Sequence, residues 1–275
     1  MSNLLLDVQG IGIAFGGLKA VQDLSIALPP GCLHGLIGPN GAGKTTAFNL
    51  LTGVYQSQTG SVRLDGVSLD GKKPHEIAKA GLSRTFQNIR LFGELTVLDN
   101  IMVGCHVRGH HSILRTVLRT PKFCAQESAM RSRAIELLGV FGMVQFANEP
   151  ARSLPYGDQR RLEICRALAT EPKVLLLDEP AAGMNPSEKK GLAKAINSIR
   201  NTFGIAILLI EHDMGLVMDI CEHITVLDHG VPIAAGTPKQ IQQDPKVVSA
   251  YLGVPVDEAD ESADATTATA SKAHA

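Results

Sequence analysis

The sequence has no marked excess of charge of either sign. Its 26 Lys and Arg residues nearly balance its 27 Asp and Glu residues, and the formal net charge is -1. Proteins that bind nucleic acid usually carry a basic stripe, so this balance gives no reason to expect nucleic acid as a partner.

Long apolar runs are also missing. The most apolar segment, IAILLI at 205–210, is far shorter than the roughly 20 residues that span a bilayer. Residues 1–10 (MSNLLLDVQG) lack the basic region and the apolar run of a signal peptide. With 44% hydrophobic and 19% charged residues, the composition is typical of an α/β protein that is soluble by itself.

Cysteine pairs with the spacing of a metal or redox site are absent. The sequence has five cysteines, an odd number, and none forms a C-x-x-C pair. They indicate reduced thiols in a cytosolic compartment. The pair His110-His111 has no third ligand in view, so we expect an exposed loop there rather than a metal site.

The order of the predicted elements indicates an α/β fold with a parallel sheet. Residues 4–30 contain two partly alternating segments, which predict antiparallel strands. Two short apolar runs, VLLLDEP at 174–180 and IAILLIEHD at 205–213, flank a helical pattern at 187–201. This pattern predicts a βαβ unit with both strands buried.

Two further regions differ in character from this core. From about Leu95 to Glu171, apolar residues recur at three- and four-residue spacing, which predicts a helical segment. Residues 257–275 have almost no large apolar side chains, and we expect a disordered tail. A strand, a glycine loop and a helix are predicted around residues 31–53, and a hairpin is predicted around 228–230.

A phosphate-binding loop is the strongest single signal. Residues 38–45 read GPNGAGKT, a complete G-x-x-x-x-G-K-[ST] pattern after a predicted strand and before a predicted helix. Glycines let backbone N–H groups converge on phosphate oxygens at a helix N-terminus. Lys44 would reach the β- and γ-phosphates, and the Thr45 hydroxyl would bind Mg²⁺. The predicted nucleotide-binding residues here are Gly38, Asn40, Gly41, Gly43, Lys44, Thr45 and Thr46.

Acidic residues and a histidine follow the two buried strands. The first strand is expected to end at Leu177, so that Asp178 and Glu179 emerge at its carboxyl end, where open α/β sheets bind ligands. Asp178 would then hold Mg²⁺ through water, and Glu179 would polarise the attacking water. His212 follows the second strand at the same edge and is predicted to contact the γ-phosphate.

These motifs, in this order, resemble an ATP-binding cassette (ABC) ATPase. Residues 38–46 resemble the Walker A motif, VLLLDEP the Walker B motif and AAGMNP (181–186) the D-loop. Gln87 in RTFQN resembles the Q-loop glutamine, a catalytic residue and metal ligand, and His212 resembles the switch histidine. Phe15 matches the aromatic position that stacks on adenine.

The resemblance implies a P-loop NTPase (RecA-like) parallel-sheet core, an antiparallel β subdomain and an inserted α-helical subdomain at about 95–171. The nucleotide-binding domain would span residues 1–256 and would bind ATP and Mg²⁺. LPYGDQRRLEICRAL (154–168) falls where the ABC signature belongs. In this family the signature contacts the ATP of a second cassette, which implies contacts from Leu154, Tyr156 and Gly157.

The signature segment departs from the usual family pattern. Pro155 stands where most ABC proteins have a serine whose hydroxyl contacts the γ-phosphate, and proline supplies neither a hydroxyl nor an N–H group. Its fixed φ angle suits the start of a helix. Arg160 and Arg161 are expected to be surface or packing residues rather than phosphate ligands.

The match is more specific for the ATPase subunits of branched-chain amino acid importers. Five segments resemble that family: YGDQRRLEI, DEPAAGMNP, IEHDMGLVM, AYLG (250–253) and the insertion with LRTPKF (118–123). The resemblance implies a second ABC ATPase subunit, identical or homologous, two membrane permeases and, indirectly, a periplasmic solute-binding protein. It places the chain peripherally on the cytoplasmic face of the inner membrane.

Two alternatives remain within the wider family. The ATPase of a lipopolysaccharide exporter usually carries two glycines in its signature, whereas this chain has Tyr156-Gly157. Soluble ABC proteins of translation or DNA repair generally join two cassettes or insert a coiled coil. Among solutes, branched-chain amino acids are favoured, while short amides and urea stay open because the ATPase does not touch the solute.

Overall fold

Two β-sheets form the framework of the molecule. The computed structural model describes residues 4–107 and 120–252. The first sheet is antiparallel, with the order β2-β1-β4-β5. Its strands are β1 (Leu6–Phe15), β2 (Leu18–Leu28), β4 (Thr59–Leu64) and β5 (Val67–Ser68).

The second sheet has the order β10-β9-β3-β8-β7-β6 and is parallel except for β10, which forms a hairpin with β9. Every residue of β3, β7 and β8 is buried, as expected for strands that are covered on both faces. The strands are β3 (Leu33–Ile37), β6 (Leu82–Arg84), β7 (Val174–Asp178), β8 (Ala206–Ile210), β9 (His223–Asp228) and β10 (Val231–Gly236).

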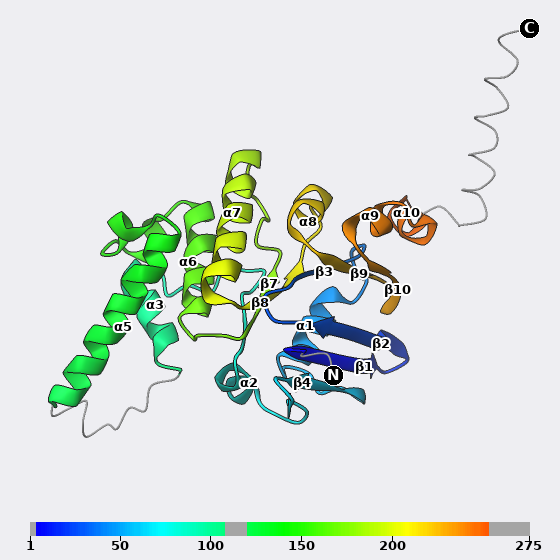
Figure 1. Ribbon diagram of the computed structural model, residues 1–275, viewed down its shortest axis with the longest axis horizontal. Helices are drawn as coiled ribbons and strands as arrows, with labels where there is room; N and C mark the ends of the chain where they lie inside the picture. The colour runs from blue at the N-terminus through cyan, green and yellow to red at the C-terminus, as the bar shows by residue number, and fades with distance from the viewer. Residues whose placement is uncertain (1–3, 108–119, 253–275) are drawn as a thin grey trace, which may run out of the picture.

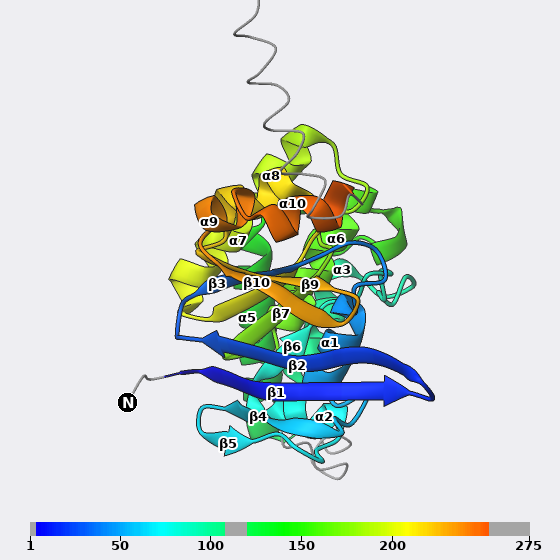
Figure 2. The same cartoon turned by 90° about the vertical axis from the view of Figure 1, so that its right-hand side faces the viewer.

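Alternating side chains of the parallel strands enter two separate cores. In β7, Leu176 packs with Phe48 of α1 (Lys44–Leu51) and with residues of the antiparallel sheet, so α1 lies between the two sheets (Figure 2). Leu175 and Leu177 face the opposite side, where helices cover the sheet. The β-strand period of two therefore builds a three-layer arrangement with the first turn of α1 at the sheet edge.

Helices cover the far face and one end of the parallel sheet (Figure 1). α7 begins with a capping box between Asn185 and Glu188 and ends at Gly204 in the left-handed conformation. α3, α5 and α6 gather at the end away from the antiparallel sheet. The remaining bounds are α2 (Pro74–Ala80), α3 (Val97–Cys105), α5 (Pro121–Val140), η1 (Val144–Phe146), η2 (Ala151–Ser153), α6 (Tyr156–Leu168), α7 (Pro186–Phe203), α8 (Met214–Ile220), α9 (Pro238–Gln242) and α10 (Pro245–Leu252).

The predicted fold class, a parallel-sheet core with an antiparallel β unit and a helical unit, is confirmed. One detail of the prediction was wrong. β7 does not end at Leu177 but includes Asp178, because the ladder to β8 continues to the pair Asp178–Ile210. The expected tail at 257–275 and the His110-His111 pair lie outside the described residues, as does part of the LRTPKF segment.

In the described ranges, 4–107 and 120–252, we find no helix with the length and apolar character needed to cross a membrane.

Candidate functional site

The loop between β3 and α1 depends on glycine at two close approaches. Gly43 precedes α1 with φ 99°, and a Cβ atom there would lie 2.5 Å from the Ala20 carbonyl oxygen. A Cβ on Gly38 would lie 2.1 Å from the Leu227 carbonyl oxygen. These approaches hold the loop against its neighbours, and the N–H groups of the first turn of α1 have no partner within the helix and can bind an anion.

Lys44 begins α1 and folds back over the loop. Its side-chain Nζ donates hydrogen bonds to the carbonyl oxygens of Gly38 (2.7 Å) and Pro39 (2.9 Å). Burial lowers the pKa of the amine, and the carboxylates of Glu179 and Asp178 oppose that change. The amine therefore lies at the centre of the loop, where phosphate oxygens would replace the two carbonyl partners.

The loop borders a cavity of about 450 Å³, which is large enough for a small-molecule ligand. Six predicted site residues lie outside the lining that the described residues give this cavity: Leu154, Tyr156, Gly157, Gly38, Asp178 and His212. The predicted site residues that do line it are Phe15, Asn40, Gly41, Gly43, Lys44, Thr45, Thr46, Gln87 and Glu179.

Phe15, which lines the cavity, forms an aromatic pair with Tyr55. Phe15, at the end of β1, is 45% exposed, and its ring and the Tyr55 ring form a T-shaped pair with centroids 5.2 Å apart. An exposed aromatic ring that is packed against a second ring offers a surface on which a planar base can stack. Sequence reasoning identified Phe15 but missed Tyr55, because nothing in the sequence pairs two residues from separate elements.

Glu179 lies close to the other two predicted catalytic residues, Gln87 and His212. Its Oε2 accepts a hydrogen bond from Gln87 Nε2 at 3.1 Å and lies 3.6 Å from His212 Nδ1. Its backbone has φ 47°, the left-handed region that non-glycine residues rarely adopt. Such strain costs about 1–3 kcal/mol and is concentrated at functional sites, so it supports a special role for this carboxylate.

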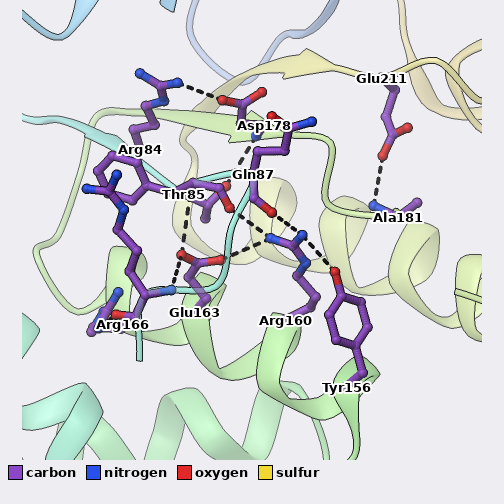
Figure 3. A network of polar contacts seen from close by, with 12 residues as sticks. Arg84, Thr85, Gln87, Tyr156, Arg160, Glu163, Arg166, Asp178, Ala181 and Glu211 are labelled. Atoms are coloured by element: carbon purple, nitrogen blue, oxygen red, sulfur yellow. Dashed lines mark hydrogen bonds and ion pairs between the residues drawn. The ribbon is translucent and has the colours of Figure 1, made fainter. Parts of the chain in front are cut away.

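Asp178 does not emerge at the sheet edge as its position after an apolar run suggested. It is 1% exposed, and its Oδ2 lies 2.6 Å from the guanidinium Nη2 of Arg84. Its backbone N–H donates to Thr85 Oγ1 at 3.2 Å (Figure 3). Asp178 therefore lies buried behind the lining of the cavity, because β7 continues through the residue, and its predicted role of holding Mg²⁺ through water stays a prediction.

The oxygen donors around the cavity fit Mg²⁺. Thr45 and Gln87, two of the predicted metal ligands, contribute a hydroxyl and an amide to the lining, and Glu179 contributes a carboxylate. Mg²⁺ prefers hard oxygen ligands and is often held by one or two carboxylates together with phosphate oxygens. The third predicted ligand, Asp178, would act through water from behind this lining.

The signature segment leads into α6 away from the cavity. Pro155 occupies the N-cap position with φ −54° and ψ 152°, and α6 begins at Tyr156. Tyr156 is 47% exposed, Leu154 is buried, and Gly157 lies near Glu188. The first N–H groups of α6 have no partner within the helix, and the residues at this helix start lie outside the lining of the cavity.

Two side chains of α6 hold the backbone of the Gln87 segment (Figure 3). The Arg160 guanidinium donates to the carbonyl oxygens of Phe86 (2.8 Å) and Gln87 and to the Tyr156 hydroxyl (2.9 Å). Glu163 Oε1 accepts from the backbone N–H groups of Phe86 and Arg90, each at 3.4 Å. Arg160 is 3% exposed, so the expectation of a packing role agrees with its position.

Glu211 is a further buried carboxylate that sequence reasoning passed over. It is fully buried, and its Oε1 accepts a hydrogen bond from the Ala181 N–H at 2.8 Å. Burial raises the pKa of this carboxyl. The residue fixes the start of the 181–186 segment rather than facing the cavity.

Comparison with known proteins adds independent information. The sequence model of the ABC transporter family matches residues 21–182, and that of the branched-chain amino acid ATP-binding cassette transporter matches residues 231–257. The chain is 46% identical over 253 residues to the high-affinity branched-chain amino acid transport ATP-binding protein BraF of Pseudomonas aeruginosa. It is 47% identical over 253 residues to the protein of the same description, LivG, of Escherichia coli K12. Both matches cover 92% of this chain and 99% of the relative.

More distant similarities extend to another transport class and to solved structures. The lipopolysaccharide export system ATP-binding protein LptB of Haemophilus influenzae is 32% identical over 249 residues, with 90% of this chain and 97% of that protein covered. A crystal structure of an ATP-binding cassette of an ABC transporter in its ADP conformation is 32% identical with a TM-score of 0.80, over 91% of this chain and 99% of that chain.

Proposed function

Because this chain belongs to the ATP-binding cassette transporter family, we propose that it is the ATP-hydrolysing subunit of an importer for branched-chain or related amino acids. The observation that carries the proposal is the near-half identity to BraF and LivG over almost their whole length. The lipopolysaccharide exporter ATPase is the second candidate, and its lower identity places it behind the importer.

The chain is a nucleotide-binding ATPase, and the cavity beside α1 is its proposed ATP site. The N–H groups of the loop and of the first turn of α1 would bind the phosphates, with Lys44 supplying the positive charge. Phe15, supported by Tyr55, would stack on the adenine. Thr45 and Gln87, with Asp178 behind them, would hold Mg²⁺, which neutralises developing charge on the phosphates when bound.

Hydrolysis is assigned to the carboxylate of Glu179. Its hydrogen bond from Gln87 and its proximity to His212 fix its direction at the edge of the cavity. From there Glu179 would orient the attacking water and accept its proton. His212 has a side chain that is 59% exposed, so it is accessible to the γ-phosphate or to a partner.

The signature residues support a site shared between two cassettes. Leu154, Tyr156 and Gly157 lie outside the lining of the cavity, at the start of α6, where the first N–H groups of the helix have no partner within it. A second cassette, identical or homologous, would place its nucleotide against this helix start. The positive end of the helix would then stabilise the γ-phosphate across the interface.

A groove of about 440 Å³ between α2, α3 and α6 is the proposed contact for a permease subunit. Phe92 and Val103 expose 50% and 39% of their surface there, and Phe86 and Arg90 belong to the segment that α6 holds. An apolar segment of a permease seated in this groove would contact the Gln87 segment from behind. That contact would couple hydrolysis to transport and hold the chain on the cytoplasmic face of the membrane.

Reconstitution of the purified membrane complex tests the proposed function. The chain should co-purify with two integral membrane permeases from detergent-solubilised membranes, and proteoliposomes should take up leucine in an ATP-dependent manner. Lys44→Ala should abolish uptake, because the charge that offsets the phosphates is lost. Co-purification with lipopolysaccharide export proteins, or with no membrane protein at all, would contradict the proposal.

The groove has a separate test. Phe92→Asp should reduce permease co-purification while nucleotide binding persists, because a charge buried in an apolar contact is unfavourable. Val67→Asp is the matched control, since Val67 is 57% exposed on β5 of the antiparallel sheet. Equal co-purification of the two variants would exclude the groove as the contact.

A further inference from the structure

Arg84 links three elements that carry the proposed nucleotide site. It ends β6, and its guanidinium contacts Asp178 of β7 at 2.6 Å and Asn49 Oδ1 of α1 at 2.7 Å. The guanidinium also lies over the rings of Phe48 and Phe86, 5.5 Å and 5.4 Å from their centroids. Such packing holds the charge in one place, because two aromatic rings and two polar partners contact the guanidinium.

The Arg84–Asp178 pair is buried, with side chains that are 7% and 2% exposed. A buried carboxylate without a partner is strongly unfavourable, so Asp178 needs a neighbouring cation. Arg84 is that cation. Paired in this way, the Asp178 carboxylate has its negative charge partly offset by the guanidinium beside it.

The charged side chains in the lining of the cavity carry more positive than negative charge. Lys44 and Glu179 both line it, one positive and one negative, and Lys19 also lies in the lining. A divalent cation entering alone would meet these positive charges and no unpaired carboxylate from β7. Phosphate groups change the balance, because their several negative charges attract the cation.

We propose that Arg84 is the charge partner that prevents Asp178 from attracting a divalent cation on its own, so that the protein takes up the cation only together with nucleotide phosphates. This inference rests on the proposed ATPase function and deepens it. Arg84 acts through Asp178 and is thus a positioning residue. Its place directly before Thr85, Phe86 and Gln87 also ties the Gln87 segment to the same carboxylate.

Binding of Mn²⁺ without nucleotide, followed by electron paramagnetic resonance of the purified chain, tests the proposal. Arg84→Gln should bind Mn²⁺ about tenfold or more tightly than the wild type, since one neighbouring charge changes a carboxylate's affinity for a proton by at least this much. Arg84→Lys keeps the charge and should behave like the wild type. The double variant Arg84→Gln/Asp178→Asn should lose the added binding.

Two controls separate this effect from general damage. Arg152→Gln removes an arginine from an exposed ion pair with Glu94 and should leave Mn²⁺ binding unchanged. Binding of a fluorescent ADP analogue in EDTA reports whether each variant keeps its fold. If Arg84→Gln does not fold, Arg84→Met replaces it, because the methionine side chain still packs between Phe48 and Phe86.

Equal Mn²⁺ binding by the wild type and a folded Arg84→Gln or Arg84→Met protein would overturn the proposal. So would added binding that survives in the double variant, or that also occurs in Arg84→Lys. Failure of the proposed function has a different signature, since the wild type would then bind neither the ADP analogue nor ATP. The two failures are therefore distinguishable in the same series of measurements.

Discussion

Replacing Pro155 by serine tests how the signature segment works. Pro155 occupies the N-cap of α6, and its carbonyl oxygen accepts from the N–H groups of Asp158 and Gln159, both at 3.0 Å. Serine can adopt the same φ and ψ angles of −54° and 152°. The substitution therefore adds a hydroxyl and an N–H group without requiring the helix to move.

The expected change in stability is small because two effects oppose each other. A serine at the N-cap stabilises a helix by about 1 kcal/mol, since its side-chain oxygen accepts a backbone N–H bond. Loss of proline destabilises by about 0.4–1 kcal/mol, because the unfolded chain becomes more flexible. The melting temperature should consequently stay within about 3 °C of the wild-type value.

The expected change in activity is larger. Loss of one preorganised donor costs about 10²–10³ in rate in acyl-transfer enzymes, and in the proposed shared site several N–H groups of α6 would share the phosphate charge. We therefore expect Pro155→Ser to raise the ATPase rate by about tenfold. The increase should occur in a homodimer, or in whichever composite site uses this signature, and it is measured by phosphate release from the assembled complex.

Pro150→Ser serves as the matched control. Pro150 is the N-cap of η2, with similar angles of −60° and 136°, but it precedes a different helix. It should leave the ATPase rate unchanged. If Pro155→Ser is no faster than the wild type, the missing hydroxyl does not limit turnover and the reasoning is wrong.

Three further predictions concern the loop, the base and the core. Gly43→Ala should destabilise the fold by about 2–5 kcal/mol and abolish nucleotide binding, because the added Cβ atom meets both a left-handed backbone and a clash with a carbonyl oxygen. Gly204→Ala is its control: Gly204 has φ 62° and no atom near the added Cβ, so the substitution should destabilise the fold by about 1–2 kcal/mol and leave nucleotide binding unchanged. Glu179→Gln should keep nucleotide affinity but lower hydrolysis by about 100-fold or more, and ATP should then trap a two-cassette dimer on a sizing column. Burial, aided by the neighbouring His223, lowers the pKa of His34 to about 4 from 6.5. The imidazole of His34 binds a proton more readily in the unfolded chain, so the free energy of unfolding should fall as the pH drops from 6.5 towards 4, by about 2 kcal/mol at pH 5. Urea unfolding of the wild type and of His34→Gln measures this effect, and the free energy of unfolding of His34→Gln should depend less on pH.

Local sequence patterns were sufficient to predict the main chain around the site. The loop at 38–45 and its helix follow from glycine positions and apolar periodicity, which act over a few residues. The burial of β7 and β8 follows from continuous apolar runs for the same reason. Glu179 and Gln87 were identified as catalytic candidates by motif, and the structure places them in hydrogen-bond contact.

Contacts between distant segments could not be predicted in this way. Arg84 meets Asp178, and Tyr55 supports Phe15, only because the sheets bring separate elements together. The left-handed backbone of Glu179 has no sequence signal either, since glutamate rarely adopts it. Even the end of β7 was misplaced by one residue, because the strand ladder and not residue type decides where pairing stops.

Hydrogen bonds from Arg160 and Glu163 of α6 fix the backbone of residues 86–90, so a movement of α6 would move Gln87 with it. The side chain of Gln87 contacts Glu179 at the cavity, whereas its backbone carbonyl oxygen accepts a hydrogen bond from Arg160 of α6. A rotation of the helical unit would therefore pull Gln87 away from Glu179 or press it closer. A small tilt of α6 would thus lengthen or shorten the hydrogen bond from Gln87 to Glu179, the carboxylate to which we assign hydrolysis.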